Sequence, residues 1–274
     1  MGRLGTCLAR ALHRGLPDSL VVASRSPEPP QRLAAELGSR VEAIPVRDVC
    51  ARAQLLFLTV PDGEIAGLCE QLAVGPAHAV VHCSGSLARA PLECAAARGA
   101  ATGVFHPLQA FIDASAGNLF AGIHIGVEAD EPLAAELAAI ASALGSVSFS
   151  LSGVDRARYH AAAVFASNYL VALFAAAARI WQQAGLPSEH ARAALLPLSR
   201  GALSAIADHD LVAALTGPVR RGDIDTVRRH VEALAGDPDS QQLYRALAAE
   251  LVRLPLALPE DLQRRLAELI AGRS

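Results

Sequence analysis

Leu20-Val21-Val22-Ala23 and Leu55-Leu56-Phe57-Leu58-Thr59-Val60 are short apolar runs that lie on either side of a helical pattern at residues 30–37. Continuous apolar runs of this length are typical of strands buried on both faces. The same alternation continues to about residue 150. Further β-rich runs occupy residues 79–83, 102–105, 123–127 and 147–149, and further helical patterns occupy residues 64–72, 92–98 and 132–144. This alternation predicts βαβ units and a mostly parallel sheet.

The texture of the sequence changes after a polar stretch at residues 150–153. From Asp155 onward, long helical patterns rich in alanine and leucine are separated by Gly185-Leu186-Pro187 and Thr216-Gly217-Pro218. We therefore predict an α/β domain at residues 1–152, with a Rossmann-type, doubly wound and mostly parallel sheet. An all-helical domain is expected at residues 153–274.

All 24 basic side chains are arginine, so the chain of 274 residues contains no lysine. This absence excludes Schiff-base aldolases, pyridoxal-phosphate enzymes and Walker-type nucleotide hydrolases, which each need a lysine amine. With 27 acidic residues, the formal net charge is −3. That balance argues against a nucleic-acid-binding surface and against binding to anionic membranes.

The five cysteines include no CxxC pair and no Cys/His spacing typical of a metal centre. We therefore expect a reducing, cytoplasmic location, thiols that act as small core residues, and no metal. The N-terminus lacks the apolar segment of a secretory signal. Residues 161–178 are the most membrane-like stretch, but Ser167 and Asn168 lie in its middle. We interpret this stretch as a fully buried helix rather than a lipid-facing span.

Gly2-Arg3-Leu4-Gly5 runs directly into a helical pattern at residues 7–14. These four residues match the end of a G-x-G-x-x-G turn, in which glycines let the backbone approach a pyrophosphate at a helix N-terminus. The first glycine of that turn and the strand before it are missing. We expect that the first strand is truncated, and that the natural start lies upstream and encodes a short apolar strand ending in glycine. A helix cap or a chance pair of glycines is the alternative interpretation.

Ser24 and Arg25 follow the apolar run at residues 20–23, where a dinucleotide fold reads the adenosine ribose. An acid there binds the 2′-hydroxyl of NAD, whereas an arginine accommodates the 2′-phosphate of NADP. No acid is adjacent to Arg25 in the sequence, so the pattern favours NADP (NADPH). The alternative is a solvated arginine in a loop.

The ends of the later strands carry most of the remaining candidate residues, because ligands bind at the carboxyl edge of a parallel sheet. Thr59, Val60 and Pro61 are expected to flank the cofactor, and Ser84 lies in a small polar turn that can approach a ligand closely. His106 is held in an extended conformation by the proline that follows it. It is a candidate catalytic group, and the alternative is a structural histidine.

Two polar clusters stand out in the helical half. Tyr159 and His160 open a long helical pattern, and positions 160, 164 and 168 would fall on one face, so His160 and Asn168 could line one cleft. A buried amide such as Asn168 needs a partner, which could equally be another helix. Arg220 and Arg221 lie on a loop bounded by glycine and proline, which suggests a site for an anion. A solvated charged loop, with Asp223 capping the helix that follows, is the alternative.

The motifs taken together resemble a known group of proteins. The stretches that carry the resemblance are Gly2-Arg3-Leu4-Gly5, Ala23-Ser24-Arg25, Thr59-Val60-Pro61-Asp62, His82-Cys83-Ser84-Gly85, His106-Pro107-Leu108-Gln109, Tyr159-His160-Ala161-Ala162-Ala163, Ala166-Ser167-Asn168-Tyr169-Leu170, Leu215-Thr216-Gly217-Pro218 and Arg221-Gly222-Asp223. The series resembles a bacterial family of short-subunit dehydrogenase-like proteins, with a Rossmann-like domain and a C-terminal helical domain of unassigned function. Its layout is similar to that of pyrroline-5-carboxylate reductase, ketopantoate reductase and the β-hydroxyacid dehydrogenases.

The resemblance implies NADP binding in the first domain, a cleft between domains, and a homodimer formed through the helical half. Ketopantoate reductase and the β-hydroxyacid dehydrogenases carry a catalytic lysine one turn before an asparagine on the long helix. Here Asn168 is present, but Val164 stands in the place of that lysine. A proton would therefore have to come from His160, Tyr159 or His106. The stretch Ala205–Asp210 also stands where the family usually carries an asparagine before the Leu-Thr-Gly-Pro stretch.

We predict an NADP-dependent oxidoreductase that reduces a small anionic carbonyl or imine. His160 would be the general acid, Asn168 would orient the carbonyl, and His106 and Ser84 would face the nicotinamide and the substrate. Gln109, Tyr159, Arg220 and Arg221 are the remaining candidates for substrate binding. The missing lysine supports an alternative from another class, which is a non-catalytic NADP-binding sensor or partner protein.

Overall fold

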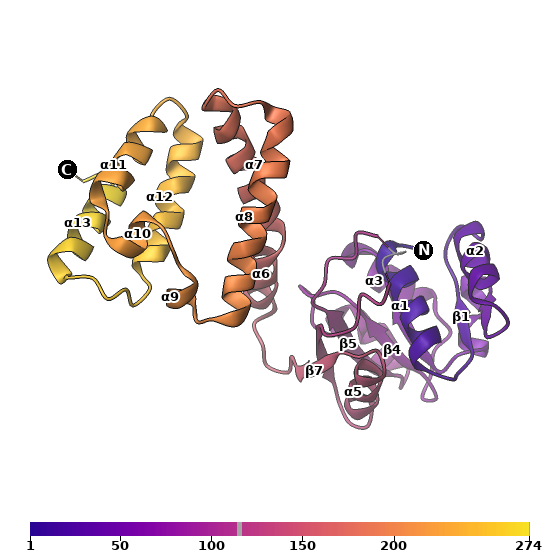
Figure 1. Ribbon diagram of the computed structural model, residues 1–274. Coiled ribbons are helices and arrows are strands. Elements are labelled where there is room, and N and C mark those ends of the chain that lie inside the picture. Colours follow the sequence, from indigo (N-terminus) through magenta and orange to yellow (C-terminus); the bar gives the residue numbers. More distant parts are fainter. Residues whose placement is uncertain (114–116, 274) are drawn as a thin grey trace. The chain divides into compact units, whose positions relative to one another are not determined.

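A computed structural model describes residues 1–113 and 117–273. The chain divides into two compact units, Met1–Ser167 and Asn168–Ser274. The boundary predicted at residue 152 corresponds to the end of the sheet, whose last strand stops at Ser150, whereas the first unit also includes the helix that follows. The elements of both units are labelled in Figure 1.

The main sheet of the first unit has five strands, in the order in which they occur in the chain. They are β3 (Leu55–Leu58), β4 (Ala79–His82), β5 (Ala101–Pro107), β6 (His124–Ala129) and β7 (Val147–Ser150). Neighbouring strands are parallel except for β5 and β6, which pair antiparallel with His106 opposite Gly126. The predicted fold class, a mostly parallel Rossmann-type sheet followed by helices, is confirmed.

A second, two-stranded sheet pairs β1 (Leu20–Val22) in parallel with β2 (Val41–Ala43). The sequence analysis missed β2 because it is only three residues long and contains Glu42. Among the described residues, no strand joins β1 to β3, so the two sheets are separate. A doubly wound fold would place one further strand at this position.

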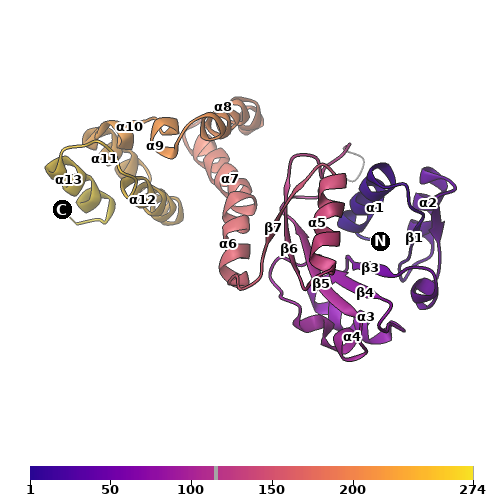
Figure 2. The same cartoon turned by 90° about the horizontal axis from the view of Figure 1, so that it is seen from below.

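Short helices connect the strands, and two longer helices cover one face of the main sheet. The connections of the first unit are α1 (Arg3–Gly15), α2 (Glu28–Leu37), η1 (Val46–Ala51), η2 (Asp62–Glu64), α3 (Ile65–Gln71), η3 (Ala90–Leu92), α4 (Glu93–Ala97), α5 (Leu133–Ala143) and α6 (Arg156–Ala166). Figure 2 shows α1 and α5 on the same side of the strands. The predicted helices at residues 30–37, 64–72, 92–98 and 132–144 are therefore confirmed.

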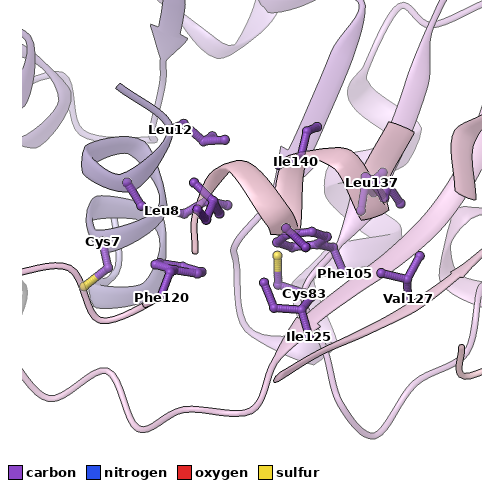
Figure 3. Packing of buried hydrophobic residues seen from close by; sticks show 14 of the residues in the cluster. Cys7, Leu8, Leu12, Cys83, Phe105, Phe120, Ile125, Val127, Leu137 and Ile140 are labelled. Carbon is purple, nitrogen blue, oxygen red and sulfur yellow. The ribbon is translucent and has the colours of Figure 1, made fainter. Parts of the chain in front are cut away.

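The core between this helical layer and the sheet is mainly aliphatic. Leu8 and Leu12 from α1 and Leu137 from α5 pack against Phe105 and Ile125 of the sheet (Figure 3). Phe105, Ile125 and Leu137 have no exposed surface. A second cluster, around Ile65 and Val80, fills the other face beneath α3 and α4.

The second unit is helical throughout its described part. It contains α7 (Asn168–Gln183), α8 (Ser188–Asp208), α9 (Leu211–Ala214), α10 (Pro218–Arg221), α11 (Ile224–Ala233), α12 (Pro238–Val252) and α13 (Glu260–Ile270). Its core lies between α11, α12 and α13, around Val227 and Leu266, which are fully buried.

The prediction of a fully buried helix at residues 161–178 is wrong for this chain. Ala176 is the only residue of α7 that is buried, and the side chain of Val171 is 72% exposed. The helix is also interrupted at Ser167, where the backbone leaves helical geometry. Positions 160, 164 and 168 therefore do not share one face of a continuous helix.

The region Arg156–Gln183 is the one stretch among the described residues that is long and apolar enough to cross a membrane. Its mean hydropathy is 1.8, and 6% of the apolar window is buried within the chain. Such a composition is weak evidence for a membrane span, because core helices of other proteins also have it.

Candidate functional site

The N-terminus of α1 lies against the carboxyl end of β3. Gly2 is the N-cap residue and supplies no side-chain cap, so the first backbone N–H groups of α1 remain available. A Cβ atom added at Gly5 would lie 2.5 Å from Thr59 Oγ1, whereas one added at Gly2 would have 3.9 Å to Thr59 O. Glycine at position 5 therefore allows α1 to pack closely on the end of this strand, and the uncapped helix end is suited to an anion.

The end of β1 carries Ser24 and Arg25. The Ser24 hydroxyl donates to Ser26 O at 2.6 Å. The side chain of Arg25 is 87% exposed and lies 3.5 Å from Glu64 Oε1. Glu64, which is far from Arg25 in the sequence, is thus close to Arg25 in space. An exposed pair of this kind is weak, so Arg25 can exchange Glu64 for another anion at little cost.

A hydrogen-bonded network joins the loops after β3 and β4. The hydroxyls of Ser84 and Ser86 both donate to Asp62 Oδ2, at 2.8 and 2.7 Å. Ser84 Oγ in turn accepts from the backbone N–H groups of Ser86 and Leu87, each at 3.2 Å. Ser84, which we expected to face the ligand, is therefore buried. Its hydroxyl group forms its hydrogen bonds within these loops.

His82, at the end of β4, is fully buried beneath the same loop. Its Nδ1 accepts from Ser84 N at 3.2 Å, so Nε2 carries the proton and donates to Ala88 O at 2.9 Å. Burial lowers the pKa of His82. A neutral ring with both nitrogens satisfied makes His82 a structural residue that shapes the loop.

His106 contacts both that loop and α6. Its Nδ1 lies 2.7 Å from the hydroxyl of Tyr159. A Cβ atom added at Gly85 would be 2.6 Å from both Cε1 and Nε2 of His106, so the ring lies directly on Gly85. Burial, reinforced by the nearby His160 and Arg156, lowers the pKa of His106 to about 4. Burial also raises the pKa of Tyr159 to about 12. Both groups are therefore neutral at neutral pH, and a single hydrogen bond joins them.

Arg156, which the sequence analysis missed, is a buried cation beside this pair. The side chain is 8% exposed, and its Nη2 donates to Glu128 Oε2 on β6. Its Nη1 is buried and has no hydrogen-bond partner, and the same is true of His160 Nδ1. Arg156, Tyr159 and His160 occupy positions i, i+3 and i+4 of α6 and therefore share one face. That spacing is the sequence signal that would have identified Arg156.

The other predicted residues lie elsewhere. Val60 and Pro61 follow β3 as expected, but Gln109 is exposed and its Oε1 accepts from Ala110 N. Asn168 is the first residue of the second unit, and its expected role in orienting a carbonyl stays a prediction.

Arg220 and Arg221 form the last turn of α10, in the second unit, rather than part of an irregular loop. Asp223 caps α11 by accepting from Thr226 N at 3.0 Å and from Thr226 Oγ1 at 2.8 Å, which confirms the capping alternative. Its pKa is lowered, first by the bond from Thr226 N. In the part of the chain that the structure describes, no group of three or more His, Cys, Asp or Glu is arranged to hold a metal ion.

The geometry can be compared with that of known proteins. Residues 1–107 match the Rossmann-like domain family. Residues 123–251 match a second family, described as a domain of unknown function (DUF2520). The chain thus combines a Rossmann-like domain with this C-terminal domain, and neither description names a short-subunit family. A comparison with curated proteins found no match.

Several solved structures are similar to the whole chain. One is a Bacteroides fragilis protein that carries a provisional name as an NADP oxidoreductase; it is 29% identical, with 91% of this chain and 94% of that chain covered and a TM-score of 0.72. An Aspergillus terreus reductive aminase in complex with NADPH and ethyl levulinate is 16% identical, with 100% and 96% covered and a TM-score of 0.66. A 1-pyrroline-5-carboxylate reductase from Streptococcus pyogenes is 14% identical, with 100% and 95% covered and a TM-score of 0.60. At these identities, the last two show the fold alone.

Proposed function

We propose that the protein is an NADP-dependent oxidoreductase that reduces a small anionic carbonyl or imine. The observation that carries the proposal is the buried Arg156, whose free Nη1 lies in the same cluster as His106, Tyr159 and His160 at the carboxyl edge of the sheet. An unpaired buried N–H is costly unless a ligand accepts from it. The provisional name of the Bacteroides fragilis relative is consistent with this class of reaction.

The residues present fit a dinucleotide. Gly2 and Gly5 leave the end of α1 open for a pyrophosphate, and Arg25 is accessible to a 2′-phosphate. Two strand spacings, about 10 Å, separate β3 from β5, so a dinucleotide that crosses the strand ends would bring its nicotinamide toward His106. Bound there, the reduced cofactor supplies the hydride.

The chain supplies binding groups and a proton. Arg156 Nη1 would donate a hydrogen bond to a carbonyl or carboxylate oxygen of the substrate, and Glu128 would hold the guanidinium in position. His160 is our candidate for the general acid, because its Nδ1 is buried beside this cation without a partner. The hydrogen bond between His106 and Tyr159 would hold the ring of His106 in a fixed orientation beneath the substrate.

Cofactor preference tests the first half of the proposal. We expect NADPH to raise the melting temperature more than NADH does. Arg25→Ala should weaken NADPH binding while leaving NADH binding nearly unchanged, because only NADPH carries the 2′-phosphate. Arg32→Ala, on the exposed part of α2, is a matched control that should change neither. Stronger binding of NADH by the unaltered protein would contradict the assignment.

Turnover tests the second half. NADPH oxidation should be measured against a panel of 2-keto acids, and of imines formed from them with small amines. We expect His160→Gln to lower kcat by about 10²- to 10⁴-fold, as removal of a general acid does. Arg156→Gln should mainly raise KM for substrates that carry a carboxylate. His190→Gln, on the exposed surface of α8, should retain full activity.

The alternative, an NADP-binding sensor, predicts a different outcome. Tight NADPH binding without oxidation by any compound of the panel would favour it over the enzyme. The five cysteines are free, which agrees with a reducing compartment such as the cytoplasm.

We also propose that the second unit forms a homodimer. Large apolar side chains are exposed on α7 and α8, including Val171 and Leu198, each 72% exposed. Burial of such side chains stabilises association. Val171→Glu should shift the sedimentation coefficient toward that of a monomer, whereas Arg192→Glu should not. A monomeric unaltered chain would contradict the proposal.

A further inference from the structure

Two cysteines lie side by side in the first unit, where α3 packs against α4 (Figure 2). Cys69 belongs to α3 and Cys94 to α4. The thiol of Cys94 donates to the sulfur of Cys69 at 2.9 Å, although the two residues are 25 positions apart in the sequence. A disulfide bond is about 2.05 Å long, so the two sulfur atoms need to approach by less than about 1 Å to form one.

Further contacts hold the pair together. The backbone N–H of Ala95, the residue that follows Cys94, donates to the sulfur of Cys69, which directs that sulfur toward the start of α4. At the end of α4, Arg98 Nη1 donates to Leu72 O, at the end of α3, at 2.7 Å. The two helices are thus tied to each other beside the thiols, and small side-chain rotations are enough to bring the sulfur atoms into bonding distance.

The two thiols differ in their access to solvent. Cys69 has no exposed surface, whereas Cys94 is partly exposed. Burial, reinforced by the hydrogen bond with Cys94, raises the pKa of Cys69 to about 12. Because the thiolate is the reactive form of cysteine, Cys69 alone is a poor target for an oxidant. An oxidant in solution therefore meets Cys94 first, and Cys69 lies within reach of the product.

We propose that Cys94 and Cys69 form a reversible disulfide bond when the protein meets a hydroperoxide, with Cys94 oxidised first. With hydrogen peroxide, the sulfur of Cys94 attacks one oxygen, the O–O bond breaks, and the thiol proton leaves with the other oxygen as water. Cys94 is then a sulfenic acid. The sulfur of Cys69 next attacks that of Cys94, the S–O bond breaks, and the hydroxide takes the proton of Cys69 and leaves as a second water. The two electrons lost by the thiols reduce the peroxide.

The disulfide bond has two consequences. It removes the sulfenic acid before a second peroxide converts it to a sulfinic acid, which is not readily reversed. A small thiol in excess returns both cysteines to the reduced form and is itself oxidised to a disulfide. The bond also closes a loop that contains β4, and such a closure stabilises a folded protein by restricting the unfolded chain.

Peptide mapping tests the bond directly and needs no assay of enzymatic activity. Because the chain has no lysine, trypsin cleaves only after arginine, and Cys69 and Cys94 fall in the separate peptides 53–89 and 90–98. The folded protein would be treated with a few equivalents of hydrogen peroxide, then unfolded, alkylated with iodoacetamide and digested. We expect the two peptides to be linked, with Cys83 alkylated, and dithiothreitol to separate them. A link through Cys83, a link between two molecules, or no link would overturn the proposal.

Single substitutions test the order of the two steps. In Cys69→Ala, which places no polar group in the buried position, dimedone should trap a sulfenic acid on Cys94, and excess peroxide should convert Cys94 to a sulfinic acid. In Cys94→Ser, Cys69 should stay reduced because it is buried. Cys50→Ser is the matched control, since Cys50 is a partly exposed thiol at the same apolar cluster, and it should form the linked peptides as the unaltered protein does. Equal oxidation of Cys69 in Cys94→Ser would overturn the assignment of Cys94 as the first residue oxidised.

Thermal unfolding tests whether the native arrangement accommodates the bond. The oxidised protein should melt at least about 5 °C above the reduced protein, and dithiothreitol should remove the difference. Cys69→Ala, treated with peroxide in the same way, should show no such increase. A linked protein that melts below the reduced protein would mean that the bond forms only by distorting α3 and α4, and would overturn the proposal.

Discussion

The buried ring of His106 should make the first unit sensitive to mild acid. Its pKa is lowered from 6.5 to about 4 in the folded state. Between these two values the unfolded chain binds a proton that the folded chain does not bind, so the free energy of unfolding falls as the pH falls. As far as His106 determines it, the free energy of unfolding is highest above about pH 6.5 and falls progressively as the pH drops toward about 4. Below about pH 4, His106 lowers the free energy of unfolding no further.

The magnitude follows from the size of the shift. Each pKa unit corresponds to 1.36 kcal/mol, so a shift of about 2.5 units gives an upper bound of about 3 kcal/mol. At about pH 5.5, roughly 3% of His106 should be protonated in the folded protein, whereas an ordinary histidine would be roughly 90% protonated.

The assay combines a stability measurement with a direct titration. The unaltered protein and the His106→Gln variant would each be unfolded in urea at several pH values between about 8 and 4.5. Amide exchange at Phe105 and Ile125, which lie in the core of the first unit, would be the probe of unfolding. Glutamine can still bond to Tyr159 but does not titrate. The difference in unfolding free energy between the two proteins should therefore change by up to about 3 kcal/mol across this range. The Cε1–H resonance of His106, assigned by its loss in the variant, should titrate near pH 4.

His190→Gln is the matched control, because His190 is exposed on α8. Its stability should follow that of the unaltered protein at every pH. A His106 resonance that titrates near pH 6.5, or a difference in stability that does not vary with pH, would refute the reasoning from burial.

Three further predictions concern the same unit. Gly85→Ala should displace the ring of His106, since the added Cβ would lie 2.6 Å from it, and should move the pKa of His106 back toward 6.5 in the same NMR titration. Arg156→Met should destabilise the protein by about 3 kcal/mol in urea unfolding at neutral pH, because it leaves Glu128 largely buried without its closest cation; Arg158→Met, at an exposed pair, should cost less than about 1 kcal/mol. Cys83, whose pKa burial raises to about 12, should resist iodoacetamide in the native state and react on unfolding, and rapid alkylation of the folded protein would contradict its burial.

The sequence predicted the strands of the main sheet because each is a short β-rich run that alternates with a helical pattern or a turn, as at residues 79–83 and 147–149. It did not predict β2, because Glu42 interrupts its short apolar pattern, whereas β1, which is equally short, is entirely apolar. The fully buried helix was predicted from composition alone, which cannot distinguish an apolar surface such as that of Val171 from a core.

The candidate site was predictable only in part. The sequence places His106 and Ser84 near one another because strand ends converge at one edge of a parallel sheet, and their roles in binding stay predictions. The bond to Tyr159 and the ion pair of Arg156 with Glu128 join residues that are 53 and 28 positions apart, and no local pattern encodes such pairings. The role expected for Asn168 stays a prediction, although the continuous helix from which it was argued is interrupted at Ser167.

The carboxylate of Asp62 fastens two loops with one oxygen atom, since both Ser84 and Ser86 donate to Oδ2. Loops that are already fixed lose little conformational freedom when a ligand arrives, so more of the contact energy is retained as affinity. Association at this edge should accordingly be fast and close to rigid-body docking, with a rate that depends little on temperature beyond that of diffusion. The rigidity also has a drawback, because loops held in this way cannot reshape themselves around a bulky compound. If this edge binds the substrate proposed above, the two serine hydroxyls bound to Asp62 would favour small compounds over bulky ones.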